Sequence, residues 1–191
     1  MTAAAGLPVA WLVARAAGLV AFGILTLATW AGLGMSTRLF GPRSAKRLLG
    51  WHRTLAWTGL GALALHVLGL LADPVLRFTP AAVLVPLAAP WHPVAVAGGV
   101  VAGWLMLMLA VSFRLRRWIG QRGWRRLHYA SFAAFLLALL HALSAGTDLA
   151  GVHGQVLAAV AGGPVLFLVL LRILAPARRA PARAPSPAGV V

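Results

Sequence analysis

Residues 50–69 read GWHRTLAWTGLGALALHVLG, and after Arg53 no charged residue follows until position 73. A helix of about 20 apolar residues is long enough to cross the hydrocarbon core of a bilayer. Four more uncharged stretches of at least that length occur in the chain, at 16–37, 78–113, 127–147 and 149–171. The sequence therefore predicts an all-α, polytopic membrane helical bundle.

Five membrane-spanning helices are predicted from these stretches and their immediate neighbours. Their expected ranges are about 9–36, 50–72, 94–115, 125–145 and 152–174. Residues 78–93 contain four prolines, which disfavour a helix interior, so we expect an interfacial or re-entrant connection there. Residues 176–191 are rich in Pro, Ala and Arg and are expected to form a disordered, basic cytoplasmic tail.

The composition excludes a soluble globular enzyme. Of the 191 residues, 61% are hydrophobic and only 10% are charged, whereas a soluble domain has roughly 25% charged residues. The two acidic residues, Asp73 and Asp148, lie in separate segments, which excludes acid/base catalysis by a carboxylate pair. Because the chain has no cysteine, disulfides, iron–sulfur clusters and covalently attached haem are excluded as well.

The net charge of +15 is distributed as a membrane topology signal and does not indicate a nucleic-acid partner. The basic residues gather after the first, third and fifth predicted spans, which places them on one side of the membrane. The other side holds Arg15 and Arg77 together with both aspartates. The positive-inside rule then places the N-terminus outside and the C-terminus inside the bacterial cytoplasmic membrane. Membrane lipids are the expected neighbours of the basic segments.

Four histidines lie within the predicted spans and form two pairs matched in depth. The second span holds His52 and His66, and the fourth holds His128 and His141. Both spans run from inside to outside, so His52 and His128 form an inner pair. His66 and His141 form an outer pair, about 21 Å away along the helices at 1.5 Å per residue.

This arrangement suits haem. Haem iron takes two axial ligands on opposite faces of a flat ring, and neutral imidazole supplies such ligands. The two pairs therefore predict two haem b groups, stacked across the membrane. A single intramembrane histidine would more simply be a packed polar residue, and two histidines are too few ligands for a typical zinc site.

The helical phase of the two histidine spacings differs. His52 and His66 are fourteen residues apart, about 1400° of rotation, so they share one face of a helix. His128 and His141 are thirteen residues apart, about 140° short of four full turns. We therefore expect either that the fourth span is bent or locally re-wound, or that the two haems are rotated differently.

Three arginines are candidate partners for the carboxylates of haem, because guanidinium groups pair well with carboxylates. Arg53 and Arg126 adjoin the inner histidines, and ordinary positive-inside charge is the alternative for both. Arg15 lies inside the first span near its outer end, with extension to the outer headgroups as the alternative. Five tryptophans near the span ends are expected to be interface anchors. They are Trp11, Trp51, Trp91, Trp118 and Trp124.

The two histidine spacings, on non-adjacent helices, resemble the ferric reductase-like transmembrane domain, the haem module of ferric reductases and NADPH oxidases. The tract LGWHRTLA and the turn GQRGWRRLHYASF resemble small bacterial members. The resemblance covers about residues 12–175 and makes 1–175 one di-haem transmembrane domain. It implies that His52 and His128 ligate the inner haem, and that His66 and His141 ligate the outer one. Many members have six spans where five are counted here, and the large members carry a flavin and nicotinamide domain for which no Gly-rich fingerprint is found.

The expected function is transfer of single electrons from a cytoplasmic-side donor to an outer-side acceptor. The donor would be a separate cytoplasmic flavin reductase or a similar protein, and the acceptor a ferric chelate, oxygen or a periplasmic protein. Three alternatives remain open. They are the haem subunit of a two-component periplasmic methionine sulfoxide reductase, a quinone-linked superoxide oxidase, and a haem-free helical scaffold or solute carrier. His92 and His153, both expected on the outer side, are candidates for an acceptor or proton site.

Overall fold

The computed structural model describes residues 9–37, 41–146, 149 and 151–174. The tail expected at 176–191 and the residue Asp148 lie outside this part of the chain. Within it, helices form the regular structure and no strand occurs. The helices are α1 (Val9–Thr37), α2 (Pro42–Ala72), α3 (Pro80–Leu84), α4 (Pro93–His128), α5 (Ala130–Ala145) and α6 (Val152–Leu174). The prediction of an all-α membrane helical bundle is confirmed.

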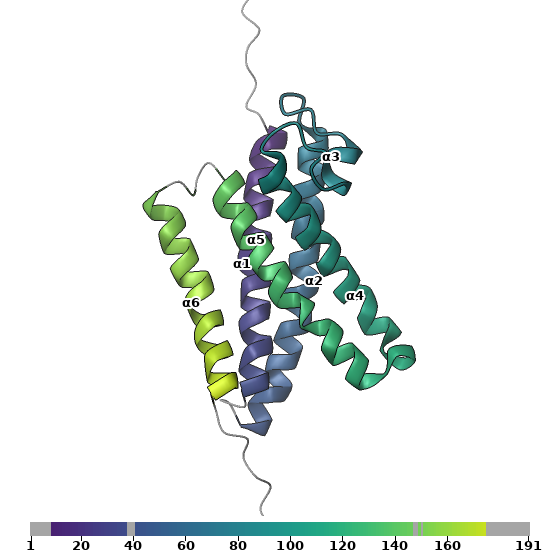
Figure 1. The fold of residues 1–191 in the computed structure, drawn as a ribbon, viewed down its shortest axis with the longest axis vertical. Coiled ribbons are helices and arrows are strands. Elements are labelled where there is room, and N and C mark those ends of the chain that lie inside the picture. The colour runs from purple at the N-terminus through teal and green to yellow at the C-terminus, as the bar shows by residue number, and fades with distance from the viewer. Residues whose placement is uncertain (1–8, 38–40, 147–148, 150, 175–191) are drawn as a thin grey trace, which may run out of the picture.

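Four helical stretches in the described chain are long and apolar enough to cross a membrane. One of them, Pro93–Ala145, has 53 residues and would be about 80 Å long if it were straight. Its backbone leaves helical geometry at Gly120, with φ 70° and ψ 165°. The chain reverses at Gly120, inside α4, and residues 121–128 together with α5 run back beside the first part of α4 (Figure 1). We call this reversal at Gly120 the α4–α5 turn. The stretch is thus a helical hairpin, which agrees with the five predicted spans.

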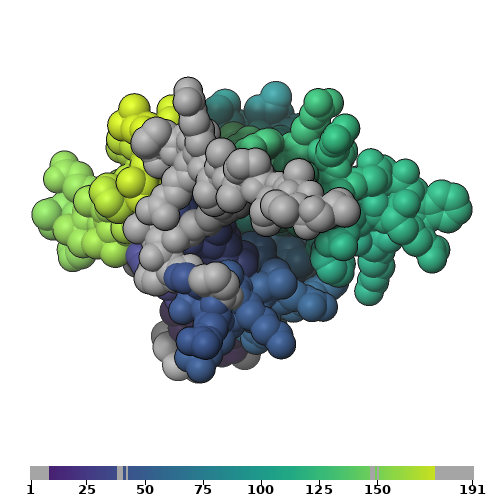
Figure 2. Space-filling model, turned by 90° about the horizontal axis from the view of Figure 1, so that it is seen from below, coloured from purple at the N-terminus to yellow at the C-terminus, as the bar shows by residue number. Residues whose placement is uncertain are grey.

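The basic segments lie together at one end of the bundle. In Figure 1 the end of α1, the start of α2, the α4–α5 turn and the end of α6 are all at the bottom. We call this the basic end; it holds Arg43, Lys46, Arg47, Arg53, Arg114, Arg116, Arg117, Arg122, Arg125, Arg126 and Arg172. Seen from this end, the α4–α5 turn projects from one side of the molecule and α6 forms the opposite side (Figure 2).

The connection between α2 and α4 covers the other end, which we call the α3 end (Figure 1). The carboxylate of Asp73 ends α2 by accepting hydrogen bonds from the backbone N–H groups of Val75 and Leu76, at 2.8 and 2.7 Å. Trp104 of α4 donates its indole N–H to the carbonyl oxygen of Leu84 at 2.8 Å and so fastens the connection to the bundle. Apart from the short α3, residues 78–93 are irregular, as their prolines predict.

Helix α1 occupies the centre of the bundle and packs against α2, α5 and α6. Small residues allow α1 and α2 to approach closely, as is common between membrane helices. A Cβ atom at Gly69 would lie only 2.9 Å from the backbone nitrogen of Ala14. On the other side of α1, one buried apolar cluster joins it to α5 and α6. The cluster consists of Phe22, Leu33, Phe135, Leu139, Ala161 and Val165.

Candidate functional site

The four intramembrane histidines meet in the pairs that their depths predict. The ring centroids of the inner pair, His52 on α2 and His128 at the end of α4, are 6.0 Å apart. Those of the outer pair, His66 on α2 and His141 on α5, are 6.4 Å apart. The two rings of each pair are inclined by 71° and 72°. Histidines far apart in sequence are therefore brought into two equivalent arrangements at two levels of the bundle.

The separation of the rings is that of two imidazoles with one metal ion between them. A metal–imidazole nitrogen bond is about 2 Å long and the ring centre lies about 1 Å behind the nitrogen, so two opposed ligands have centroids about 6 Å apart. Edge-to-face contact between two rings falls in the same distance range. The hydrogen bonds of the rings determine which nitrogen remains for a ligand.

Three of the four rings are held by a backbone carbonyl through Nδ1. His52 contacts the oxygen of Ala28 at 2.7 Å, and His66 contacts that of Ala14 at 2.7 Å. His141 contacts the oxygen of Ala95 at 2.9 Å. Since a carbonyl only accepts, Nδ1 carries the proton and Nε2 keeps its lone pair. This is the tautomer in which protein histidines bind metals, with the second nitrogen fixing the orientation of the ring.

A glycine faces each of these three rings, one helical turn after the carbonyl that binds it. A Cβ atom at Gly18 would lie 2.8 Å from Nδ1 of His66, and one at Gly99 would lie 2.9 Å from Nδ1 of His141. At Gly32 the distance to Nδ1 of His52 would be 3.4 Å. At Gly18 and Gly99 the missing Cβ lets the ring reach the carbonyl four residues earlier, whereas the ring opposite Gly32 has more room. The pairs are Ala14–Gly18, Ala28–Gly32 and Ala95–Gly99.

These three glycines were not among the residues singled out from the sequence, although the repeated Ala-x3-Gly spacing on the helices opposite the histidines was a usable signal. Gly59 and Gly61, which lie between the histidines of α2, have other surroundings. A Cβ at Gly59 would meet the side chain of Leu25 at 2.7 Å, and nothing lies within 4 Å of one at Gly61. Gly59 therefore serves close packing between α1 and α2.

His128 differs from the other three histidines. Its Nδ1 is buried without a hydrogen-bond partner in the described part of the chain. Its ring instead stacks on that of Trp124, with centroids 4.9 Å apart and planes inclined by 26°. Trp124 is half-buried, and its own Nε1 is also buried without a partner there.

The helix is locally re-wound next to His128, which is one of the adjustments expected from the thirteen-residue spacing. The N–H of Tyr129 donates to the carbonyl oxygen of Arg126 at 3.1 Å, and that of Phe132 donates to Tyr129 at 3.1 Å. Bonds over three residues tighten the turn and add rotation relative to an α-helix. Helix α4 accordingly ends at His128 and α5 begins at Ala130.

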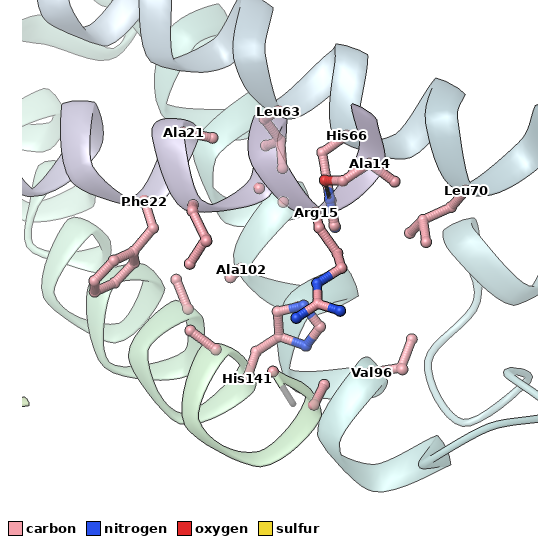
Figure 3. Close-up of a pocket in the computed structure, with 18 of the residues that line it drawn as sticks. Ala14, Arg15, Ala21, Phe22, Leu63, His66, Leu70, Val96, Ala102 and His141 are labelled. Atoms are coloured by element: carbon pink, nitrogen blue, oxygen red, sulfur yellow. Dashed lines mark hydrogen bonds between the residues drawn. The ribbon is translucent and has the colours of Figure 1, made fainter. Parts of the chain in front are cut away.

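A cavity of about 250 Å³ lies beside the outer pair, between α1, α2, α4 and α5 (Figure 3). Its lining is almost entirely apolar apart from His66, His141 and Arg15. Arg15 points into the cavity from α1, and its guanidinium carbon lies 4.0 Å from the ring centroid of Trp11. An apolar space with two imidazoles and one cation suits a flat apolar ligand that carries carboxylates.

Arg53 and Arg126, the candidate partners of an inner haem, both have exposed side chains at the basic end. The guanidinium of Arg53 lies 5.6 Å from the ring centroid of Phe113 on α4. Neither side chain is enclosed in a cavity in the way that Arg15 is. The structure thus places one of the three arginines, Arg15, in a pocket with histidines.

The tryptophans divide into two groups, and the prediction that all five are interface anchors is wrong in part. Trp51 and Trp118 are 65% and 76% exposed, as anchors would be. Trp11 and Trp91 instead line the cavity of the outer pair, and Trp124 stacks on His128. The reason is that the histidines also lie close to the ends of the spans, so a tryptophan at the same depth can reach them.

Two phenylalanines stack between the two histidine levels. The rings of Phe22 and Phe135 are 6.0 Å apart and inclined by 23°, and both residues are buried. Phe22 lies on α1 between the two alanines whose carbonyls bind His66 and His52. Phe135 lies midway between His128 and His141 in the sequence. This pair therefore fills the apolar interior between the inner and the outer histidines.

The two remaining histidines lie outside these pairs: His92 directly precedes α4, and His153 is the second residue of α6. His92 precedes α4 with a φ of 43°, and its ring packs against Trp91 with centroids 4.2 Å apart. His153 is exposed at the start of α6. Neither belongs to a group of three or more His, Cys, Asp or Glu side chains among the described residues.

Each histidine pair offers two nitrogen ligands. Groups of three or more His, Cys, Asp or Glu side chains do not occur in the parts of the chain that the structure describes. Two opposed imidazoles are the axial set of a haem iron, whose remaining ligands belong to the macrocycle, and they leave a tetrahedral zinc site incomplete. Comparisons of this chain with protein-family models, with curated proteins and with solved structures found no match.

Proposed function

We propose that this chain is a di-haem b protein of the ferric reductase-like type that carries single electrons across the bacterial cytoplasmic membrane. The observation that carries the proposal is the pair of histidine arrangements, with ring centroids 6.0 and 6.4 Å apart at two levels of one apolar bundle. When bound, haem iron supplies one-electron redox chemistry in an environment of low polarity.

The side chains have distinct parts in this proposal. His52 and His128 would hold the inner haem, and His66 and His141 the outer one. The carbonyls that accept from Nδ1 orient the rings and make them more basic ligands. The stacked Phe22 and Phe135 keep water out of the space between the two levels.

The arginines are matched to the carboxylates that haem b carries. Arg15 is half-buried in the cavity beside His66 and His141, where an outer propionate would offset its charge. Arg53 and Arg126 stand beside the inner histidines in the sequence and face the basic end. We assign them to the inner propionates only because they are close to His52 and His128 in the sequence.

The basic end would face the cytoplasm under the positive-inside rule. A surface with so many arginines suits an acidic donor protein or the phosphates of a flavin, so a separate flavin reductase is the proposed source of electrons. At the α3 end, the outer haem would deliver them to a ferric chelate, oxygen or a periplasmic acceptor protein.

The haem content of the purified protein tests the proposal. We expect two haem b per chain by pyridine haemochrome assay, with the low-spin spectrum of bis-histidine ligation. A colourless protein, purified after expression with ample haem supply, would overturn the proposal and favour a haem-free scaffold or carrier. One haem per chain would show that one of the two histidine pairs has another role.

A further inference from the structure

We propose that Trp124 is a positioning residue for His128, and that ring stacking there takes the place of the backbone carbonyl that holds each of the other three histidines. The inference rests on the proposed function, in which His128 is an axial ligand. It concerns how one of the four ligands is held. It predicts that the inner site loses its ligand or its haem more easily than the outer site.

The asymmetry is seen in the hydrogen bonds. His52, His66 and His141 each contact a carbonyl oxygen through Nδ1, at 2.7 to 2.9 Å. His128 has no such contact among the described residues, although its Nδ1 is buried. A ligand ring without this bond is free to rotate about its metal bond unless packing holds it.

Packing by Trp124 supplies that restraint. Trp124 and His128 are four residues apart on the last turns of α4, a spacing that brings side chains together on one helix face. Their centroids are 4.9 Å apart and their planes are inclined by only 26°. This nearly parallel stack leaves the His128 ring little freedom to turn.

Trp124 is itself fixed from across the α4–α5 turn. The ring of Phe113 meets it edge to face, with centroids 6.3 Å apart. The guanidinium carbon of Arg116 lies 5.7 Å from the Trp124 ring and 5.7 Å from the Phe113 ring. The turn at Gly120 brings these residues together, so the hairpin acts on His128 through Trp124.

Two consequences follow for the inner site. Without an acceptor for its Nδ1 proton, His128 is a less electron-rich ligand than the other three, so its bond to iron is the easiest of the four to break. The orientation of the ring also depends on one aromatic neighbour. Removal of the Trp124 ring should therefore free His128 and leave the outer pair unchanged.

Carbon monoxide binding to the dithionite-reduced protein tests the inference, because this ligand needs an open axial position on the iron. The variants are W124A, W124F and, as a control, W118A. Trp118 is on the same turn and is 76% exposed. We expect no binding in the parent protein and in W118A, and binding to about one haem per chain, or loss of that haem, in W124A. W124F keeps an aromatic face and should restore the parent behaviour.

The outcomes separate this inference from the proposed function. If the parent protein holds two haems and W124A also holds both and stays closed to carbon monoxide, Trp124 does not position His128. Equal effects of W124A and W118A would contradict it too. If W124A does not accumulate, W124L is used instead, because leucine is large but has no aromatic face. Its carbon monoxide binding is then compared with that of W124F. A parent protein without haem would instead refute the proposed function.

Discussion

Among single residues, the glycines that face the histidine rings give two of these rings, His66 and His141, the room to reach their carbonyls. Gly18, Gly32 and Gly99 each face an imidazole, one turn after the alanine whose carbonyl accepts from it. An alanine at Gly18 or Gly99 would bring its Cβ within 3 Å of the ring. The ring would have to move away, and the hydrogen bond through Nδ1 would be lost.

The substitution Gly18→Ala should therefore weaken the outer haem, because it displaces His66. Loss of a hydrogen bond to a metal-binding histidine lowers metal affinity by about 10-fold to 100-fold. We expect the haem content of Gly18→Ala to fall towards one per chain during purification, with the inner spectrum retained.

Gly23→Ala is the matched control, since Gly23 is on the same helix and nothing lies within 4 Å of a Cβ there. It should keep both haems and gain about 0.4–1 kcal/mol in unfolding free energy from the smaller freedom of the unfolded chain. Equal haem contents in the two variants would show that Gly18 has no part in holding His66.

Among the helices, the α4–α5 hairpin carries one histidine of each pair, His128 and His141, and its turn lies at the basic end. Gly120 adopts φ 70°, a backbone conformation that residues with a side chain rarely take. The reversal at this residue places Trp124 against Phe113 and aligns His128 with His52. The inner site therefore depends on a turn that lies outside the apolar core.

Gly120→Ala should destabilise this hairpin by about 1–2 kcal/mol, because a Cβ is unfavourable at positive φ. We expect a lower temperature of thermal unfolding, with the inner haem released before the outer one. Gly123→Ala is the control, since it lies in the same turn and its Cβ would make ordinary contact with Ile119 at 3.8 Å. A Gly120→Ala protein as stable as Gly123→Ala would mean that the turn has another shape.

Much of the element level could be predicted from the sequence, and the reasons for the rest are physical. Uncharged length located all five spans, because the bilayer imposes it. The predicted span bounds and the observed helix bounds differ where a helix continues beyond the apolar stretch. Helix α2 begins at Pro42 rather than near residue 50, and α4 continues past residue 115. A helix can continue through charged residues once it has left the apolar layer. A search for uncharged stretches therefore does not locate the ends of α2 and α4.

The histidine pairs were likewise predictable, because depth along antiparallel spans follows from counting residues. Their carbonyl partners were not predicted. The Ala-x3-Gly spacing indicates where a ring could approach a helix, but which of Ala14, Ala28 and Ala95 meets which histidine is known only once the helices are packed. The stack of Trp124 on His128 was missed for a related reason. A tryptophan at a span end has two suitable environments, the membrane interface and the bundle interior, and the sequence alone does not choose between them.

At the scale of the whole molecule, the bundle is electrically polarised. The basic end gathers arginines from the start of α2, the α4–α5 turn and the end of α6, while Asp73 lies at the α3 end (Figure 1). The described chain starts at the α3 end with Val9 and finishes at the basic end with Leu174. By the positive-inside rule, this polarity predicts how the chain is oriented in the membrane.

The orientation of the chain can be checked with terminal tags in spheroplasts. A tag at the C-terminus should be protected from added protease, and one at the N-terminus should be cleaved, because positively charged segments stay in the cytoplasm. Permeabilised cells provide the control in which both tags are cleaved. The reverse protection pattern would place the basic end outside and would reverse the proposed direction of electron flow.

Whether the four histidines act as two pairs is decided by which haem each histidine variant retains. In reductive titrations followed optically, His52→Ala and His128→Ala should lose the same haem, and His66→Ala and His141→Ala should lose the other. His153→Ala, whose residue is exposed and remote from both pairs, should keep both. If all four variants retain two haems with unchanged spectra, or if the losses fall into pairs other than these, the account is wrong.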